Sequence, residues 1–403
     1  MDSSEAPGEE QDAKKTVNVI IMRLQYFMRF VLYKGTLFPL YICQPTAKSS
    51  NPCFEKMKIT LTQKSNLSRI DFNNLGFGAG LADHVFICEY KNGSWGEGRI
   101  EPYSQLNQGL GLHALHYGQA VFEGQKAYRQ ENGNIAIFRP EKNHKRLNIS
   151  AKRMLIPEVP KEIFMEGLIE LIRTDSEWVP RGKNESLYLR PFLFSSSEFV
   201  AARPSEEYTF AIVTSPVGEL YSKPVKVKIE QSFTRATSGG VGYAKAAGNY
   251  GGAFLATHNA MKEGFNQVIW TDHVDHEFIE EAGTMNIAFV MDNKLVTPAL
   301  SDRILAGITR ESIITLAKDW GIDVEERRIK VNEILQGINN GNLKEAFGMG
   351  TAAVVSQIES IGYENRIYSI GAPENGIAVK IKRALSSIRY GMSEDTHGWM
   401  HKI

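Results

Sequence analysis

The stretches Gly-Gly-Val-Gly-Tyr-Ala-Lys-Ala-Ala-Gly-Asn-Tyr, residues 239–250, and Ile-Glu-Glu-Ala-Gly-Thr-Met-Asn, residues 279–286, decide the fold of this 403-residue chain. Lys245 has small residues on both sides, so the backbone there can closely approach a flat, bulky group. A lysine in such surroundings is poorly hydrated, which favours the neutral amine that condenses with an aldehyde. A surface lysine in a Gly/Ala loop is the alternative that these few residues leave open.

The segments that follow Lys245 add a second candidate. They have the apolar spacing of one helix and three strands, at residues 251–263, 267–271, 278–281 and 287–291. Glu281 therefore lies at a strand end, before a Gly-Thr turn. A carboxylate there can keep a heterocyclic nitrogen protonated, which the pyridine ring of pyridoxal phosphate needs to act as an electron sink.

With these two stretches the chain resembles the branched-chain amino acid aminotransferases, which are fold-type IV pyridoxal-phosphate enzymes. Further motifs extend the resemblance from about residue 72 to near the C-terminus. It implies an α+β, two-domain fold like that of D-amino acid aminotransferase. We expect a small α+β domain over residues 57–216, a linker over 217–225 and a large cofactor-binding domain over 226–403.

The composition is that of an ordinary globular protein, with 42% hydrophobic and 23% charged residues. Lys plus Arg and Asp plus Glu number 46 each, so the charge indicates neither a nucleic-acid partner nor an anionic membrane. Only three cysteines occur, without the paired spacing of a zinc site or a disulfide framework. We therefore expect a cytoplasmic protein without a metal.

The first 56 residues lie outside the resemblance. Residues 1–15 are polar and are expected to be disordered. Residues 17–43 are apolar and aromatic, but Arg23, Arg29 and Lys34 leave no uncharged run long enough to span a bilayer. A basic amphipathic helix on a membrane surface is an alternative. We expect residues 1–56 to be a disordered extension, or one that precedes a true translation start at Met57.

The resemblance assigns four pocket residues. Tyr117 and Phe122, in the segment Leu-His-Tyr-Gly-Gln-Ala-Val-Phe-Glu-Gly, line the substrate pocket, and so does Tyr188 in Tyr-Leu-Arg-Pro. Aromatic walls suit a branched aliphatic side chain. Arg190, with Tyr117, would recognise the distal carboxylate of glutamate or 2-oxoglutarate. From the residues alone, a short helix that packs Tyr117 and Phe122 as core residues is the alternative.

Pyridoxal 5'-phosphate would be held by residues that the resemblance places along the chain: Arg146, Lys245, Tyr250, Glu281, Ile308, Thr309 and Thr351. Arg146 would bind the phosphate with its planar guanidinium, whereas the neighbouring Lys145 and Arg153 are expected to be surface residues. Thr309 is expected to be the N-cap of a helix whose first N–H groups also bind the phosphate. A plain capped helix and a solvated basic helix face are the alternatives.

The substrate α-carboxylate would be bound by Thr284 together with Thr351 and Ala352, in a Gly-rich turn that enters a strand. Some animal members of the resembled family carry a redox-sensing Cys-x-x-Cys after this turn. Residues 353–356 are Ala-Val-Val-Ser here, so that regulation is expected to be absent.

The resemblance therefore predicts a branched-chain amino acid transaminase. It would exchange amino groups between L-leucine, L-isoleucine or L-valine and 2-oxoglutarate, by a ping-pong reaction through a Lys245 Schiff base, as a homodimer. The alternatives are another fold-type IV activity, on D-amino acids, aminodeoxychorismate or amines, and a catalytically silent binding protein. The Tyr-Leu-Arg-Pro and Gly-Thr-Ala motifs argue against the first, and the intact set of Lys245, Tyr250 and Glu281 argues against the second.

Overall fold

The computed structural model describes residues 29–33, 36–40, 57–78 and 80–403. Contacts divide the chain into two units, Met1–Glu55 and Lys56–Ile403. In the first unit, β1 (Arg29–Tyr33) and β2 (Thr36–Leu40) pair antiparallel, so no helix runs through them.

The disorder predicted for the start of the chain lies outside the described residues. Within the described ranges, no helix combines the length and the apolar character that crossing a membrane requires.

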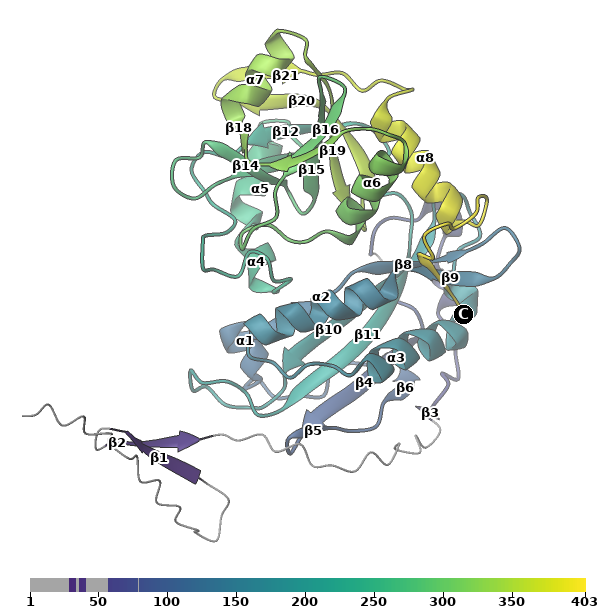
Figure 1. Cartoon of the computed structure of the whole chain (residues 1–403). Coiled ribbons are helices and arrows are strands. Elements are labelled where there is room, and N and C mark those ends of the chain that lie inside the picture. Colours follow the sequence, from purple (N-terminus) through teal and green to yellow (C-terminus); the bar gives the residue numbers. More distant parts are fainter. Residues whose placement is uncertain (1–28, 34–35, 41–56, 79) are drawn as a thin grey trace, which may run out of the picture. The chain divides into compact units, whose positions relative to one another are not determined.

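The second unit contains two large sheets (Figure 1). The first sheet has the strand order β22-β9-β8-β10-β11-β4-β6-β3, with β5 paired to β4 and β7 to β10. Its strands are β3 (Lys58–Ile59), β4 (His84–Lys91), β5 (Ser94–Trp95), β6 (Arg99–Pro102), β7 (Ala120–Phe122), β8 (Gln125–Arg129), β9 (Ile135–Phe138), β10 (Ser186–Ser195), β11 (Tyr208–Val217) and β22 (Met400–Lys402). The pairing is antiparallel throughout except between β3 and β6.

Helices α2 (Pro140–Arg153) and α3 (Lys161–Thr174) pack together and against the first sheet (Figure 1). Pro140 starts α2 with a preset backbone angle. The buried positions of α2 recur at helical spacing, and they include Arg146 beside Leu147 and Ser150. Arg146 therefore belongs to the core-facing side, and the exposed Lys145 and Arg153 form the solvated side, as predicted.

The second sheet has the order β17-β16-β15-β19-β20-β12-β13-β14-β18, with β21 paired to β20. Its strands are β12 (Val225–Ile229), β13 (Gln267–Thr271), β14 (Phe278–Ala282), β15 (Asn286–Met291), β16 (Lys294–Pro298), β17 (Val324–Arg327), β18 (Ile329–Lys330), β19 (Leu343–Gly350), β20 (Val354–Tyr363) and β21 (Arg366–Ser369). The strands expected at residues 267–271, 278–281 and 287–291 are thus confirmed as β13, β14 and β15.

The remaining helices are α1 (His113–Tyr117), α4 (Gly248–Gly251), α5 (Phe254–Lys262), α6 (Ile308–Asp319), α7 (Val331–Asn339) and α8 (Ile377–Arg389), with short 3-10 turns at Leu67–Arg69, Phe72–Asn74 and Ser176–Trp178. The helix expected over residues 251–263 is divided into α4 and α5. Helix α5 packs on β13, whereas α6, α7 and α8 all contact β19.

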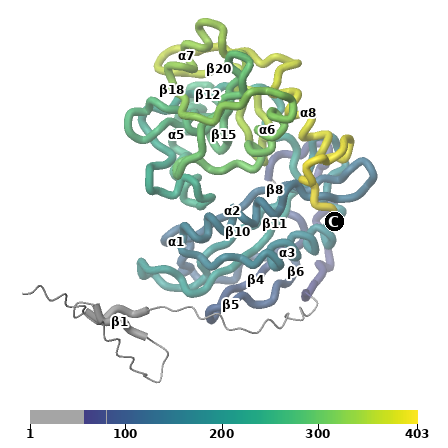
Figure 2. The backbone as a smooth tube through the Cα atoms, in the orientation of Figure 1, coloured from purple at the N-terminus to yellow at the C-terminus, as the bar shows by residue number. Residues whose placement is uncertain are grey.

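The chain returns to the first sheet after α8. Strand β22 pairs antiparallel with β9, opposite Ala136, Ile137 and Phe138. Figure 2 shows this last segment, in yellow, running from α8 to β9. The first sheet therefore combines strands from both ends of the second unit, and its edge strand comes from the segment predicted to be the large domain.

Candidate active site

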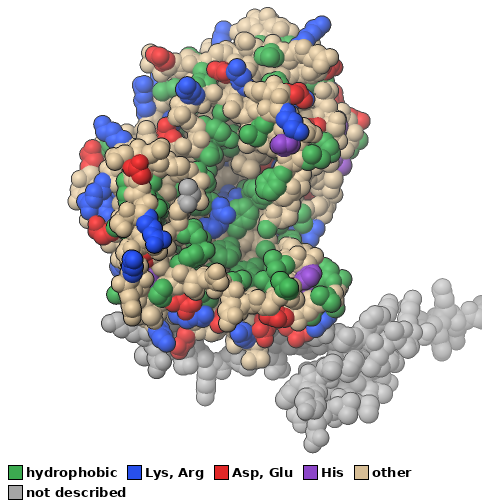
Figure 3. Space-filling model, turned by 180° about the vertical axis from the view of Figure 1, so that it is seen from behind, with side chains coloured by type: hydrophobic (Ala, Val, Ile, Leu, Met, Phe, Trp, Pro, Cys, Tyr) green, Lys and Arg blue, Asp and Glu red, His purple; other side chains and the backbone are tan. Residues whose placement is uncertain are grey.

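A cavity of about 670 Å³ lies among the ends of strands from both sheets and the start of α6. Figure 3 shows a hollow in one face of the molecule where hydrophobic and basic side chains meet. Of the predicted site residues, these line the cavity: Phe122, Arg146, Tyr188, Arg190, Lys245, Tyr250, Glu281, Thr284, Ile308, Thr309, Thr351 and Ala352. Residues that are distant in the sequence therefore meet at one place.

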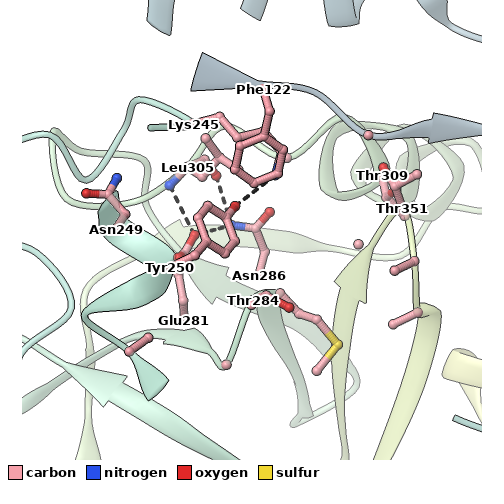
Figure 4. Close-up of a pocket in the computed structure, with 18 of the residues that line it drawn as sticks. Phe122, Lys245, Asn249, Tyr250, Glu281, Thr284, Asn286, Leu305, Thr309 and Thr351 are labelled. Atoms are coloured by element: carbon pink, nitrogen blue, oxygen red, sulfur yellow. Dashed lines mark hydrogen bonds between the residues drawn. The ribbon is translucent and has the colours of Figure 1, made fainter. Parts of the chain in front are cut away.

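Lys245 is held by contacts of its own backbone. Its N–H donates to Ser150 Oγ on α2 over 2.8 Å, and its carbonyl oxygen accepts from the N–H of Phe122 over 3.1 Å. The Nζ atom donates to the Tyr250 hydroxyl over 2.8 Å and lies 4.7 Å from the centre of the Phe122 ring. Figure 4 shows the amine, Tyr250 and Phe122 close together. A fixed backbone and a paired amine are what a lysine needs to meet a bound aldehyde at one position.

Glu281 is buried at the end of β14, where several groups hold its carboxylate. Its Oε1 accepts from Asn286 Nδ2 over 3.1 Å and from the N–H of Leu305 over 3.0 Å, and its Oε2 lies 2.9 Å from Arg235 Nε. Burial raises the pKa of Glu281, and the nearby Arg235 and Lys245 cations and the Leu305 N–H oppose that rise. The pKa of Glu281 is raised overall in this structure. A bound cation or an N–H donor would therefore favour ionisation of Glu281.

Arg146 reaches the cavity from α2 and is oriented by Glu123. Its Nε and Nη2 donate to the two oxygens of Glu123, each over 2.8 Å, and its Nη1 donates to the Ala306 carbonyl over 2.9 Å. Asn143 donates to Glu123 over 2.8 Å. Burial raises the pKa of Glu123, but Arg146 outweighs it, so this pKa is lowered overall. A bidentate pair of this kind fixes the plane of the guanidinium.

The start of α6 forms another wall of the cavity. The helix begins at Ile308, its N-cap residue is Gly307 and no side chain caps it, so the expected N-cap role of Thr309 is wrong. The cause is local: a Cβ at position 307 would collide with Asn286 Oδ1, so a glycine fits there and the helix starts one residue after it. Thr309 lies in the first turn, near Thr351 (Figure 4).

Three side chains shape the aromatic wall. Arg190 Nη2 donates to the Tyr188 hydroxyl over 3.0 Å, and the Arg190 guanidinium lies 4.7 Å from the centre of the Phe122 ring. A Cβ at Gly124 would collide with the Tyr188 hydroxyl, so this glycine allows the close approach. An arginine stacked on aromatic rings can pair with an anion when one is bound. When no anion is bound, the aromatic rings still contact the guanidinium.

Tyr117 is the predicted site residue that does not line the cavity. It ends α1, is 43% exposed and donates its hydroxyl to the carbonyl of Val200. Within this chain Tyr117 is therefore an exposed residue of the surface around α1 and not a residue of the pocket wall.

The predicted carboxylate-binding turn comprises residues 351–353, between β19 and β20. The preceding glycines belong to β19 itself rather than to the turn. Thr284 lies after β14, on the same cavity.

Comparison with known proteins agrees with this geometry. The model of the class IV amino-transferase family matches residues 120–361. A probable branched-chain-amino-acid aminotransferase of Staphylococcus epidermidis is 43% identical over 355 residues, which cover 87% of this chain and 99% of that relative. The chain belongs to the branched-chain-amino-acid aminotransferase family. The fold-type IV resemblance seen in the sequence is thereby confirmed.

Solved structures of the family have the same fold. The branched-chain aminotransferase of Thermoproteus uzoniensis, solved with norvaline, superposes with a TM-score of 0.65 at 27% identity, over 79% of this chain and 99% of that chain. The branched-chain amino acid aminotransferase of Escherichia coli gives a TM-score of 0.64 at 27% identity, over 79% of this chain and 98% of that chain.

Four polar residues of this family member were missed by sequence reasoning: Glu123, Ser150, Arg235 and Asn286. Each contacts a predicted site residue, and Arg235 and Asn286 also line the cavity. Neither spacing nor composition indicated these contacts. Glu123 could have been noticed, because a lone carboxylate between Phe122 and Gly124 has to be paired if that strand end is buried.

Proposed function

We propose that this protein transfers amino groups between L-leucine, L-isoleucine or L-valine and 2-oxoglutarate, with pyridoxal 5'-phosphate bound at Lys245. The observation that carries the proposal is the meeting of Lys245, Tyr250 and Glu281 in one cavity. The names of the relatives support the substrate class.

The residues present fit this cofactor. Glu281 would face the ring nitrogen, Tyr250 the phenolic oxygen, and Arg146 with the first turn of α6 and Thr351 the phosphate. The fit rests on the buried carboxylate of Glu281, whose pKa is raised by burial and which therefore gains from a cationic N–H partner. When bound, the cofactor supplies an electron sink for the bond that breaks at the substrate Cα.

The chain contributes proton transfer and orientation. The Lys245 amine, freed when substrate binds, moves the proton away from and back to the substrate as general base and acid. Tyr250 holds this amine from one side in the free protein. In a ping-pong reaction the first product leaves before the second substrate binds. Double-reciprocal plots of initial rate against amino-donor concentration, at several 2-oxoglutarate concentrations, should therefore give parallel lines.

The pocket accepts two kinds of side chain. Phe122 and Tyr188 provide an apolar wall for the branched side chain, and Arg190 meets the distal carboxylate of glutamate. Thr284, Thr351 and Ala352 would bind the α-carboxylate that all substrates share.

The proposed enzyme is a cytoplasmic homodimer. Its dimer interface includes the surface around α1, where Leu110 is 90% and Leu115 is 70% exposed beside Tyr117. Large apolar side chains gathered in this way indicate a surface that a protein partner covers, and a second copy would also place Tyr117 in an interface near an active site.

An absorbance spectrum of the purified protein, before and after L-leucine and then D-alanine, tests the function. A visible band of bound cofactor that L-leucine alone bleaches supports it. A band that only D-alanine bleaches would mean that the protein acts on D-amino acids instead. The absence of any band after pyridoxal phosphate is added would overturn the proposal.

A further inference from the structure

A second, small cavity shares a wall with the active-site cavity. Leu220, Ala352 and Ala353 line both. The second cavity has a volume of about 30 Å³, which is room for one or two water molecules. We refer to it as the rear cavity.

Three cations and one carboxylate line the rear cavity. Lys126 comes from β8, Lys382 and Arg389 from α8, and Glu219 from the segment after β11. Glu219 pairs with Lys382 over 2.8 Å, so its charge is already compensated. Among the described residues, neither Lys126 nor Arg389 has a carboxylate within ion-pair distance.

The two cations without a carboxylate partner are deeply buried. Lys126 is 5% exposed, and its one hydrogen bond to a described residue is a long one, 3.3 Å to the Ala352 carbonyl. Arg389 is 3% exposed, with its guanidinium 4.3 Å from the centre of the Phe138 ring. Its Nε and the hydroxyl of the buried Ser186 have no hydrogen-bond partner among the described residues. Buried charges of one sign are costly unless an opposite charge joins them.

We propose that the rear cavity binds a monatomic anion of the chloride class, held by Lys126, Arg389 and Ser186. A cavity of about 30 Å³ suits a single monatomic ion, and the Lys126 ammonium, the Arg389 Nε–H and the Ser186 hydroxyl are all donors. A water molecule could accept the same hydrogen bonds, but it would leave the charges of Lys126 and Arg389 uncompensated.

The electrostatics of Lys126 agree with this occupant. Burial and the neighbouring Arg389 and Lys382 lower the pKa of Lys126 to about 7, and Glu219 opposes them. Tyr128 and Tyr390 are the other titratable side chains that line the cavity. An anion would keep Lys126 protonated and thereby keep its bond to Ala352, in the turn that the proposed function assigns to the substrate carboxylate.

Bromide is the probe for this site, because its anomalous scattering locates it. Crystals of the full-length protein with pyridoxal phosphate, soaked in sodium bromide, should show an anomalous peak between Lys126, Arg389 and Ser186. Arg389→Gln should lose the peak, whereas Arg383→Gln, on the exposed side of the same helix, should keep it. No peak in the wild-type protein, or water density alone, overturns the proposal.

A melting experiment covers the case in which Arg389→Gln does not fold. At constant ionic strength, replacing sodium gluconate, whose anion is too large for the cavity, by sodium bromide should raise Tm by about 2 °C in wild type and Arg383→Gln. Ser186→Ala should show about half that rise. Equal shifts in all variants would contradict the site. Neither measurement requires transaminase activity, so failure of the proposed function would not be mistaken for failure of the anion site.

Discussion

Glu123 orients Arg146, a role that the sequence alone did not indicate. In Glu123→Gln one acceptor oxygen and the negative charge are lost, and Arg146 stays buried without compensation. We expect the free energy of unfolding to fall by about 3–5 kcal/mol, as for other broken buried pairs, and pyridoxal phosphate to bind more weakly. Urea unfolding and fluorescence titration measure the two effects. Glu206→Gln removes an exposed partner of the exposed Arg203 and should change both by far less.

Arg235 opposes the rise that burial causes in the pKa of Glu281. Arg235→Met removes the cation that opposes the effect of burial, so the pKa of Glu281 should rise further. A carboxylate is needed for activity, and it is lost as pH falls through its pKa. The acidic limb of the kcat/KM profile should therefore move to higher pH by about one unit. Arg235→Lys keeps the charge and should restore most of the profile; an unmoved limb in both variants would contradict this role.

Lys126 links stability to pH. Its pKa is about 7 in the folded protein and near the ordinary lysine value in the unfolded chain, so between these values the unfolded state binds more protons. The cost of burying its charge is full below pH 7 and is relieved as pH rises toward 10. In gluconate buffer the free energy of unfolding should rise from pH 7 to 9.5 more steeply for wild type than for Lys126→Met. Exposed Lys145→Met is the control, and parallel curves for wild type and Lys126→Met would exclude the effect.

At the scale of elements, the position of α6 depends on how closely Gly307 approaches Asn286. Gly307→Ala places a methyl group against Asn286 Oδ1, so either the Asn286 side chain or the start of α6 has to shift. Because Asn286 also donates to Glu281, both ends of the proposed cofactor site would be disturbed. We expect the Kd for pyridoxal phosphate to rise by about tenfold or more, which corresponds to about 1.4 kcal/mol. Gly76→Ala, where a Cβ meets no atom within 4 Å, should leave the Kd unchanged.

At the scale of the whole molecule, the exposed side chains around α1 predict association. Leu110→Glu combined with Leu115→Glu places two charges on an apolar surface, so a dimer formed there should dissociate. Analytical ultracentrifugation should show half the mass of the wild-type protein. The exposed substitution Leu255→Glu on α5 is the matched control. A wild-type protein that sediments as a monomer would contradict the proposed dimer.

The sequence predicted the parts of the site whose chemistry is explicit in the residue type. Lys245 and Glu281 could be named because an amine and a carboxylate in those motifs each suit a stated task, and Arg146 could be named from the family resemblance. Glu123 and Arg235 could not, because their role depends on contacts between segments far apart in the chain. The N-cap of α6 was predicted two residues too late, at Thr309 instead of Gly307, for the same reason, since Gly307 is in contact with Asn286. The strands were predicted well because their apolar runs are short and bounded by turns.

The pairing of β22 with β9 has a consequence for how the protein is made. The first sheet receives its edge strand only after the whole second sheet has been synthesised, so the second sheet is topologically an insertion within the first. Until β22 has left the ribosome, β9 presents an open row of backbone donors and acceptors, on which a nascent chain can pair with a neighbour. Co-translational folding of the first sheet is therefore incomplete until late in synthesis, and chaperones that shield open strand edges should matter more for this chain than for one whose domains finish in sequence order.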